Sequence, residues 1–298
     1  MLEFDGLYKS YGDNAVLQGV GFTVPDGSMF GFCGANGAGK TTTMRIAMGL
    51  ARADAGQVRW RGRPLDDDVR RRIGYMPEER GLYPRMRLLE QLAYLGGLHG
   101  MTDADAKRGA LDWLERFGLA ARRNDELQAL SHGNQQRAQL AAALVCAPEV
   151  LVLDEPFSGL DPVALDVMTG VLRERADAGV AVVFSSHELD LVERICDRVG
   201  IIDHGHLVAC GTVDDLRRGG PRRLWVDAPE AASGWADDLD ATTVVRTDGS
   251  RVLLQLGDGA DDQSVLQAAL ATGRVSEFRP AEPSLVDVFR GVVGEAAP

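Results

Sequence analysis

Apolar and polar residues alternate near the start of the chain, which predicts antiparallel strands over residues 2–8 and 15–24. Uninterrupted apolar runs predict central strands of a parallel sheet, because such strands are covered on both faces. These runs lie at 29–33, 73–76, 150–153 and 180–184. Helical patterns lie at 41–50, 88–98, 104–117 and 135–146. The pattern therefore predicts an α/β fold with a mostly helical insert at about 79–147.

The character of the chain changes at Gly219, Gly220 and Pro221, which together indicate a linker. Short strands are expected beyond it at 222–226, 242–246, 252–256 and 275–278, with helices at 261–271 and 283–292. We therefore expect two domains, residues 1–220 and a small α+β domain at 221–298. This tail has seven arginines and thirteen acidic residues, a net charge of −6. It is either a dimer contact or regulatory surface, or a passive cap on the core.

A glycine-rich octet separates the apolar run at 29–33 from the helix predicted at 41–50. It consists of Gly34, Ala35, Asn36, Gly37, Ala38, Gly39, Lys40 and Thr41. Glycines let backbone N–H groups curl around phosphates, the helix N-terminus adds positive potential, and the lysine brings a charge to the β- and γ-phosphates. The octet therefore predicts a nucleoside triphosphate site in which Thr41 holds Mg²⁺.

Two acidic residues, Asp154 and Glu155, follow the strand predicted at 150–153. Parallel strands deliver functional side chains at their C-terminal ends. Asp154 suits Mg²⁺ ligation, usually through water, and Glu155 suits polarising an attacking water. Acidic residues after a strand are equally common as solvated loop residues, so this interpretation depends on the neighbouring motifs.

Further motifs surround these residues in a fixed order, and together they resemble the ATP-binding subunits of ABC transporters. The resemblance covers residues 2 to about 218 and comprises Walker A at 34–41, a Q-loop-like segment at 75–78, the signature at 130–134, Walker B at 150–154, the D-loop at 158–161 and the switch histidine His187. Segments 77–83 and 131–136 are similar to an exporter-type, sodium- or drug-efflux branch that pairs with ABC-2 permeases.

The resemblance implies a P-loop NTPase cassette with a RecA-like core, an antiparallel β subdomain and a helical subdomain. Two cassettes, copies or paralogues, would pair head to tail around ATP and Mg²⁺. The residues that the resemblance assigns to nucleotide binding are Tyr11, Gly34, Asn36, Gly37, Ala38, Gly39, Lys40, Thr41, Thr42, Ser131, Gly133 and Asp161. Ser131 and Gly133 would close over the γ-phosphate held by the opposite chain. Tyr11 would stack on adenine; the alternative is an ordinary core or edge tyrosine.

The same resemblance implies that Glu155 orients the attacking water and that His187 holds the γ-phosphate and links it to Glu155. Two residues depart from the usual pattern. His132 replaces the first glycine of the signature pair, and Glu78 stands where a glutamine is usual. A glutamate keeps the Mg²⁺ acceptor and loses the donor, and its charge near the γ-phosphate needs Mg²⁺ or Arg80 to compensate it. Alternatively, Glu78 faces solvent and Glu79 or water takes its role.

The composition limits which partners the chain can bind and where in the cell it can lie. A net charge of −12 argues against nucleic-acid binding, which depends on neutralising phosphates. No apolar run approaches the 18 or more residues of a spanning helix, and Glu3 and Asp5 do not fit a signal peptide. Four scattered cysteines indicate a reducing compartment. The chain must therefore take any membrane path from a partner, and the resemblance implies that it lies at the cytoplasmic face of the cell membrane, bound to an integral-membrane permease. His204 and His206 are interpreted as part of a turn between two strands rather than as a metal clip.

The favoured function is an ATP-hydrolysing subunit that drives export through a separate permease. One alternative is a soluble ABC ATPase of translation or DNA repair, although most of those carry two cassettes or a long coiled coil. The other is a catalytically silent regulatory module, which the presence of Lys40, Asp154, Glu155 and His187 disfavours.

Overall fold

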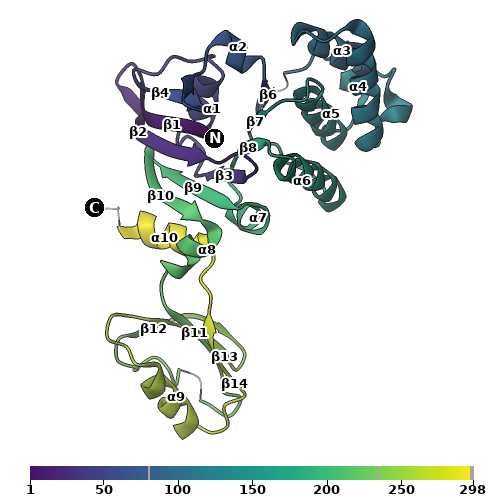
Figure 1. Ribbon diagram of the computed structural model, residues 1–298. Coiled ribbons are helices and arrows are strands. Elements are labelled where there is room, and N and C mark those ends of the chain that lie inside the picture. The colour runs from purple at the N-terminus through teal and green to yellow at the C-terminus, as the bar shows by residue number, and fades with distance from the viewer. Residues whose placement is uncertain (80, 233, 296–298) are drawn as a thin grey trace. The chain divides into compact units, whose positions relative to one another are not determined.

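The computed structural model describes residues 1–295 except 80 and 233, so Arg80, the suggested partner of Glu78, lies outside the described residues. The chain divides into two compact units, residues 1–212 and the residues from 213 onward (Figure 1). The linker expected at 219–221 follows the short helix α8 (Val213–Arg218), which belongs to the second unit. The domain boundary at residue 220 stays a prediction.

The centre of the first unit is a mostly parallel sheet with the strand order β10-β9-β3-β8-β7-β6. Its strands are β3 (Met29–Cys33), β6 (Ile73–Met76), β7 (Val150–Leu153), β8 (Ala181–Ser186), β9 (Arg198–Asp203) and β10 (His206–Thr212). All residues of β3, β7 and β8 are buried, as their apolar sequences predict. Strands β9 and β10 form an antiparallel hairpin, and its turn residues His204 and Gly205 both have positive φ.

An antiparallel sheet in the order β2-β1-β4-β5 packs against this core. Its strands are β1 (Leu2–Tyr11), β2 (Asn14–Val24), β4 (Ala55–Trp60) and β5 (Arg63–Pro64). Phe22 of β2 joins the two sheets, because its ring stacks on Phe30 and Phe32 of β3 at centroid distances of 4.9 and 4.8 Å. The alternating pattern at residues 2–24 therefore buries its apolar side against the parallel sheet.

Helices cover the parallel sheet and extend beyond one edge of it. The helices of the first unit are α1 (Lys40–Ala47), α2 (Asp67–Arg70), α3 (Leu88–Leu98), α4 (Asp103–Arg116), α5 (His132–Leu144), α6 (Pro162–Asp177) and α7 (Leu189–Ile195). Helices α3, α4 and α5 pack on one another as the predicted helical arm, and α5 also contacts edge strand β6 (Figure 1). This arrangement puts the loop after β6 between the core and the arm.

The second unit is an α+β fold, as predicted, around an antiparallel sheet in the order β12-β13-β11-β14. Its other elements are β11 (Arg223–Asp227), β12 (Thr242–Asp248), β13 (Arg251–Leu256), α9 (Asp262–Ala271), β14 (Glu277–Ala281) and α10 (Leu285–Glu295). Buried apolar residues of β11 and β13 pack against Val265 and Ala269 of α9. The last strand begins later than the predicted 275, since its pairing with β11 begins at Glu277.

One ion pair ties α10 to the sheet of this unit. The Arg223 guanidinium lies 2.7 Å from Asp287, and the two side chains are only 10% and 17% exposed. Burial raises the pKa of Asp287, but hydrogen bonds from Arg223 and from Ser284 outweigh burial and bring this pKa below its ordinary value. The charged carboxylate therefore stabilises the folded second unit.

We expect Asp287→Asn to lower the free energy of unfolding of the second unit by roughly 1–3 kcal/mol at pH 7. A depressed pKa stabilises the fold above the unfolded-state pKa of about 3.9, and this stabilisation is lost as the pH falls through the folded-state pKa. Urea unfolding followed through Trp225 and Trp235 measures the free energy of unfolding of this unit. Asp258→Asn is the control, because Asp258 is exposed. An Asp287→Asn protein as stable as Asp258→Asn at pH 7 contradicts the assignment. A difference between the two that does not shrink as the pH falls through the folded-state pKa of Asp287 also contradicts it.

Candidate functional site

The glycine-rich octet forms the turn between β3 and α1, and the packing at this turn requires glycine. Gly39 has a φ of +114°, and a Cβ there would lie 2.6 Å from Leu17 and 2.9 Å from the Val16 carbonyl oxygen. A Cβ on Gly34 would lie 2.2 Å from the Ile202 carbonyl oxygen. Side chains at these positions would push the loop away from its neighbours, so glycine is what lets the backbone of the loop approach them this closely.

A pocket opens at this loop and at the N-terminus of α1. Its lining residues are Val16, Asn36, Gly37, Gly39, Lys40, Thr41, Thr42, Glu78 and Glu155. All of them except Val16 were predicted from the sequence. Tyr11 does not line the pocket; the residue is 53% exposed, and the centre of its ring lies 5.2 Å from the Lys9 ammonium. Adenine stacking by Tyr11 therefore stays a prediction.

Lys40 is the buried cation of this pocket, with only 7% of its surface exposed. Its Nζ donates hydrogen bonds to the carbonyl oxygens of Gly34 at 2.7 Å and of Ala35 at 3.2 Å. The same ammonium lies 3.6 Å from Glu155 Oε1. The loop therefore holds a positive charge between its own backbone and an acidic side chain, in a setting that screens the charge little.

The three oxygen-bearing residues expected at Mg²⁺ lie together. Thr41 Oγ1 lies 3.2 Å from Glu78 Oε2 and 3.3 Å from Asp154 Oδ1, so its hydroxyl can donate to either carboxylate. Asp154 Oδ2 is buried and has no hydrogen-bond partner among the described residues. Burial raises the pKa of Asp154, while hydrogen bonds from Ser185 and Thr41 oppose that effect. A hard cation beside the unpartnered oxygen would stabilise the charged carboxylate, so these residues fit Mg²⁺.

Glu155 occupies an unusual backbone position at the end of β7. Its φ is +49°, in the left-handed region that few residues other than glycine adopt. The carboxylate is 8% exposed, and Oε2 lies 3.0 Å from His187 Nδ1. An ionised carboxylate only accepts hydrogen bonds, so Nδ1 donates and Nε2 of His187 is left for another partner. The predicted pair of Glu155 and His187 is therefore in contact.

The comparisons with known proteins agree with this geometry. The family described as ABC transporter matches residues 17–158, and the C-terminal domain of DrrA1-3-like ATP-binding proteins matches residues 211–293. YhaQ of Bacillus subtilis (strain 168), described as an uncharacterized ABC transporter ATP-binding protein, is 36% identical over an alignment of 304 positions, which covers 99% of each chain. The daunorubicin/doxorubicin resistance ATP-binding protein DrrA of Streptomyces peucetius is 35% identical over 99% of this chain and 93% of its own.

A solved structure of an ATP-binding subunit of an ABC transporter is 33% identical, with a TM-score of 0.68 over 74% of this chain and 92% of that one. The chain belongs to the ABC transporter ATP-binding proteins. The predicted fold and the prediction of an ATP hydrolase are thereby confirmed. None of the helices formed by the described residues is long and apolar enough to cross a membrane.

The signature and D-loop of this ABC protein form a second group of residues, outside the pocket at the P-loop. Ser131 is exposed just before α5, and His132 Nε2 lies 3.1 Å from the Ser158 carbonyl oxygen. The Asp161 carboxylate accepts a hydrogen bond from the Ala164 backbone N–H at 2.7 Å and so caps α6. The unusual His132 thus links the signature to the D-loop of its own chain.

Two residues of the ABC site were not predicted. Val16 lines the pocket from β2, and Ser185 of β8 donates a hydrogen bond to Asp154. The only sequence signal for Ser185 is that two serines, Ser185 and Ser186, end an otherwise apolar strand. Nothing in the sequence marks Val16, because its place depends on how the two sheets meet.

Proposed function

We propose that this ABC protein is the ATP-hydrolysing subunit of an exporter and that it works through a separate integral-membrane permease. The observation that carries the proposal is similarity to the drug-resistance protein DrrA over 99% of the chain, which includes the C-terminal domain as well as the cassette. A permease would supply the membrane path, and binding to it would hold the chain at the cytoplasmic face of the membrane.

The pocket residues suit phosphoryl transfer from ATP to water, which depends on positioning and on charge stabilisation. The loop N–H groups and the Lys40 ammonium would bind the phosphate oxygens. Thr41, Asp154 and Glu78 would hold Mg²⁺, which neutralises charge on the β- and γ-phosphates when bound. Glu155 would accept a hydrogen bond from the attacking water and take its proton as the new P–O bond forms, while the bond from the γ-phosphorus to the bridging oxygen breaks and ADP leaves.

His187 and the second group of residues complete the proposed site. His187 Nδ1 already donates to Glu155, so His187 fixes the direction of the carboxylate and presents Nε2 toward the γ-phosphate. Ser131 and Gly133 line no part of the P-loop pocket. We therefore assign them to the nucleotide of an opposing cassette, either a second copy of this chain or a paralogue.

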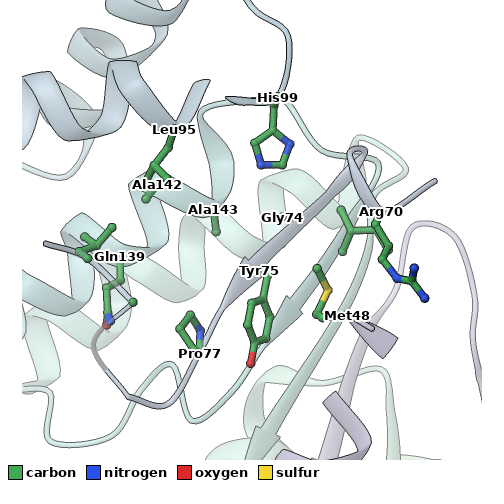
Figure 2. A pocket seen from close by; sticks show the side chains of 13 residues that line it. Met48, Arg70, Gly74, Tyr75, Pro77, Leu95, His99, Gln139, Ala142 and Ala143 are labelled. Carbon is green, nitrogen blue, oxygen red and sulfur yellow. The ribbon is translucent and has the colours of Figure 1, made fainter. Parts of the chain in front are cut away.

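A cavity of about 240 Å³ lies between the core and the helical arm, and we propose that it receives a short apolar segment of the permease (Figure 2). Met48 and Tyr75 line it from the core, and Leu95 and Ala142 line it from the arm. Its lining also includes Pro77, Gly81 and Leu82, which flank Glu78 in the sequence. A segment bound here would contact the loop that carries Glu78 to the Mg²⁺ ligands, which couples transport to hydrolysis.

A deletion strain tests the exporter assignment. Loss of the chain should sensitise cells to at least one member of a panel of toxic compounds, and the parent gene should restore resistance while Glu155→Gln should not. The protein should also co-purify with a membrane protein encoded beside it. Co-purification with ribosomes, without any membrane partner, would instead support a soluble ABC ATPase of translation.

We expect Glu78→Gln to keep ATP hydrolysis and to change mainly its Mg²⁺ dependence, because the amide retains an oxygen acceptor and removes one negative charge. Glu78→Ala removes the acceptor and should reduce permease-coupled turnover by roughly tenfold while ATP binding changes less. Coupled turnover over a Mg²⁺ series measures both effects. The exposed neighbour provides the control, Glu79→Ala. Parental turnover by Glu78→Ala at every Mg²⁺ concentration would show that Glu78 is no Q-loop residue.

A further inference from the structure

Ser185 forms hydrogen bonds with both acidic residues at the end of β7. Its Oγ donates to Asp154 Oδ1 at 2.6 Å and accepts from the Glu155 backbone N–H at 2.8 Å. The side chain is fully buried. Strand register explains the position, since Leu153 of β7 pairs with Phe184 of β8 and the following residues of each strand are neighbours.

These two hydrogen bonds restrain the Asp154 carboxylate and the backbone of Glu155. The Asp154 carboxylate has one oxygen fixed by Ser185, so its unpartnered Oδ2 keeps one direction. The backbone of Glu155 is held in the left-handed region, which costs about 1 kcal/mol or more unless the surroundings fix it. The bond to the Glu155 N–H supplies part of that restraint. Without the hydroxyl, a buried N–H and a buried carboxylate oxygen would both lose a partner.

The next residue shows that this arrangement is specific to Ser185. Ser186 is also nearly buried, at 4% exposed, but its Oγ accepts a hydrogen bond from the Glu188 backbone N–H, and among the described residues it bonds to no carboxylate. Alternate residues of a strand point to opposite faces of the sheet, so Ser185 and Ser186 do not share the face on which Asp154 accepts its hydrogen bond.

We propose that Ser185 is a positioning residue for ATP hydrolysis, which aims Asp154 Oδ2 at the cation and the Glu155 carboxylate at the attacking water. The inference rests on the roles proposed above for Asp154 and Glu155. Ser185 does not itself line the nucleotide pocket, and it acts on the reaction through the two acidic residues.

Three substitutions in the full-length protein separate the hydroxyl from the shape of the side chain. The valine side chain of Ser185→Val and the threonine side chain of Ser185→Thr have nearly the same size, but only threonine keeps the hydroxyl. We expect kcat to fall about 10- to 100-fold in Ser185→Val and Ser185→Ala, and Ser185→Thr to recover most of the rate.

A binding measurement gives a readout apart from turnover. Calorimetric titration with ATP, in EDTA and then in Mg²⁺, reports how much the cation strengthens binding. Ser185→Val should bind ATP like the parent in EDTA and lose most of the strengthening by Mg²⁺, whereas Ser185→Thr should keep it. Ser28→Ala is the control, because it removes a buried hydroxyl that bonds the Pro25 carbonyl oxygen at 2.8 Å.

The outcomes separate this inference from the proposed function. If Ser185→Val and Ser185→Thr give the same kcat and the same Mg²⁺ strengthening while Glu155→Gln is inactive, Ser185 has no positioning role and the assignment of Glu155 stands. If Glu155→Gln hydrolyses ATP at the parental rate, the assignment of Glu155 fails and the inference fails with it. If Ser185→Ala does not fold, the comparison of valine with threonine still decides.

Discussion

Glu155→Gln is expected to abolish steady-state ATP hydrolysis while ATP remains bound, so that two cassettes stay closed around the nucleotide. The amide keeps the size of the side chain and an oxygen that can accept a hydrogen bond from His187 Nδ1, which lies 3.0 Å from Glu155 Oε2 in the parent. It cannot take a proton from water, and loss of a general base lowers rates by about 10²- to 10⁴-fold. Because Lys40 and the loop are unchanged, nucleotide binding persists.

Size-exclusion chromatography with MgATP measures the trapped dimer, and phosphate release measures turnover. Glu149→Gln is a matched control, since Glu149 precedes the same strand and bonds to Arg61 and Arg72 at its opposite end. Such exposed ion pairs contribute little, so this control should hydrolyse ATP at the parental rate. A Glu155→Gln protein that stays monomeric and fully active would contradict the role given to Glu155.

Elements with uniform or strictly alternating burial could be predicted from the sequence. Strand β7 matches the predicted 150–153 because all of its residues are buried. Strand β4 was missed, since the first half of Ala55–Trp60 is exposed and shows no alternation. Helix α6 was also missed, although Asp161 followed by Pro162 is a recognisable helix start. The missed elements thus have either a weak burial signal or a local signal that the apolar pattern does not include.

The site divides in the same way. Motif spacing predicted the residues of the glycine-rich octet and Glu155. Each of these motifs is one continuous stretch of sequence, so its pattern can be recognised without knowing the fold. The sequence left open whether Glu78 faces solvent. In the structure Glu78 is an exposed residue, and its Oε2 still lies 3.2 Å from Thr41 Oγ1. Ser185 could not be predicted, since its contact with Asp154 depends on which strands are neighbours and in which register. Contacts between strands are a property of the fold and not of any local pattern.

Lys40→Ala is expected to weaken ATP binding by roughly 10- to 150-fold, which corresponds to the loss of hydrogen bonds to a charged group. The ammonium is nearly buried and bonds the Gly34 carbonyl oxygen at 2.7 Å, so the loop itself sets its position. Alanine leaves the loop N–H groups in place but removes the charge that balances the triphosphate. It also leaves Glu155, now 3.6 Å from the ammonium, as an uncompensated acid beside the γ-phosphate.

Isothermal titration with ATP in the presence of Mg²⁺ tests this expectation. Lys107→Ala is the matched control, because it makes the same change in charge at an exposed position of α4 in the helical arm. Thermal unfolding of both variants shows whether the fold is retained, and the control should bind ATP as the parent does. Parental affinity in a folded Lys40→Ala protein would mean that the backbone of the loop, and not the lysine, provides the binding energy for the phosphates.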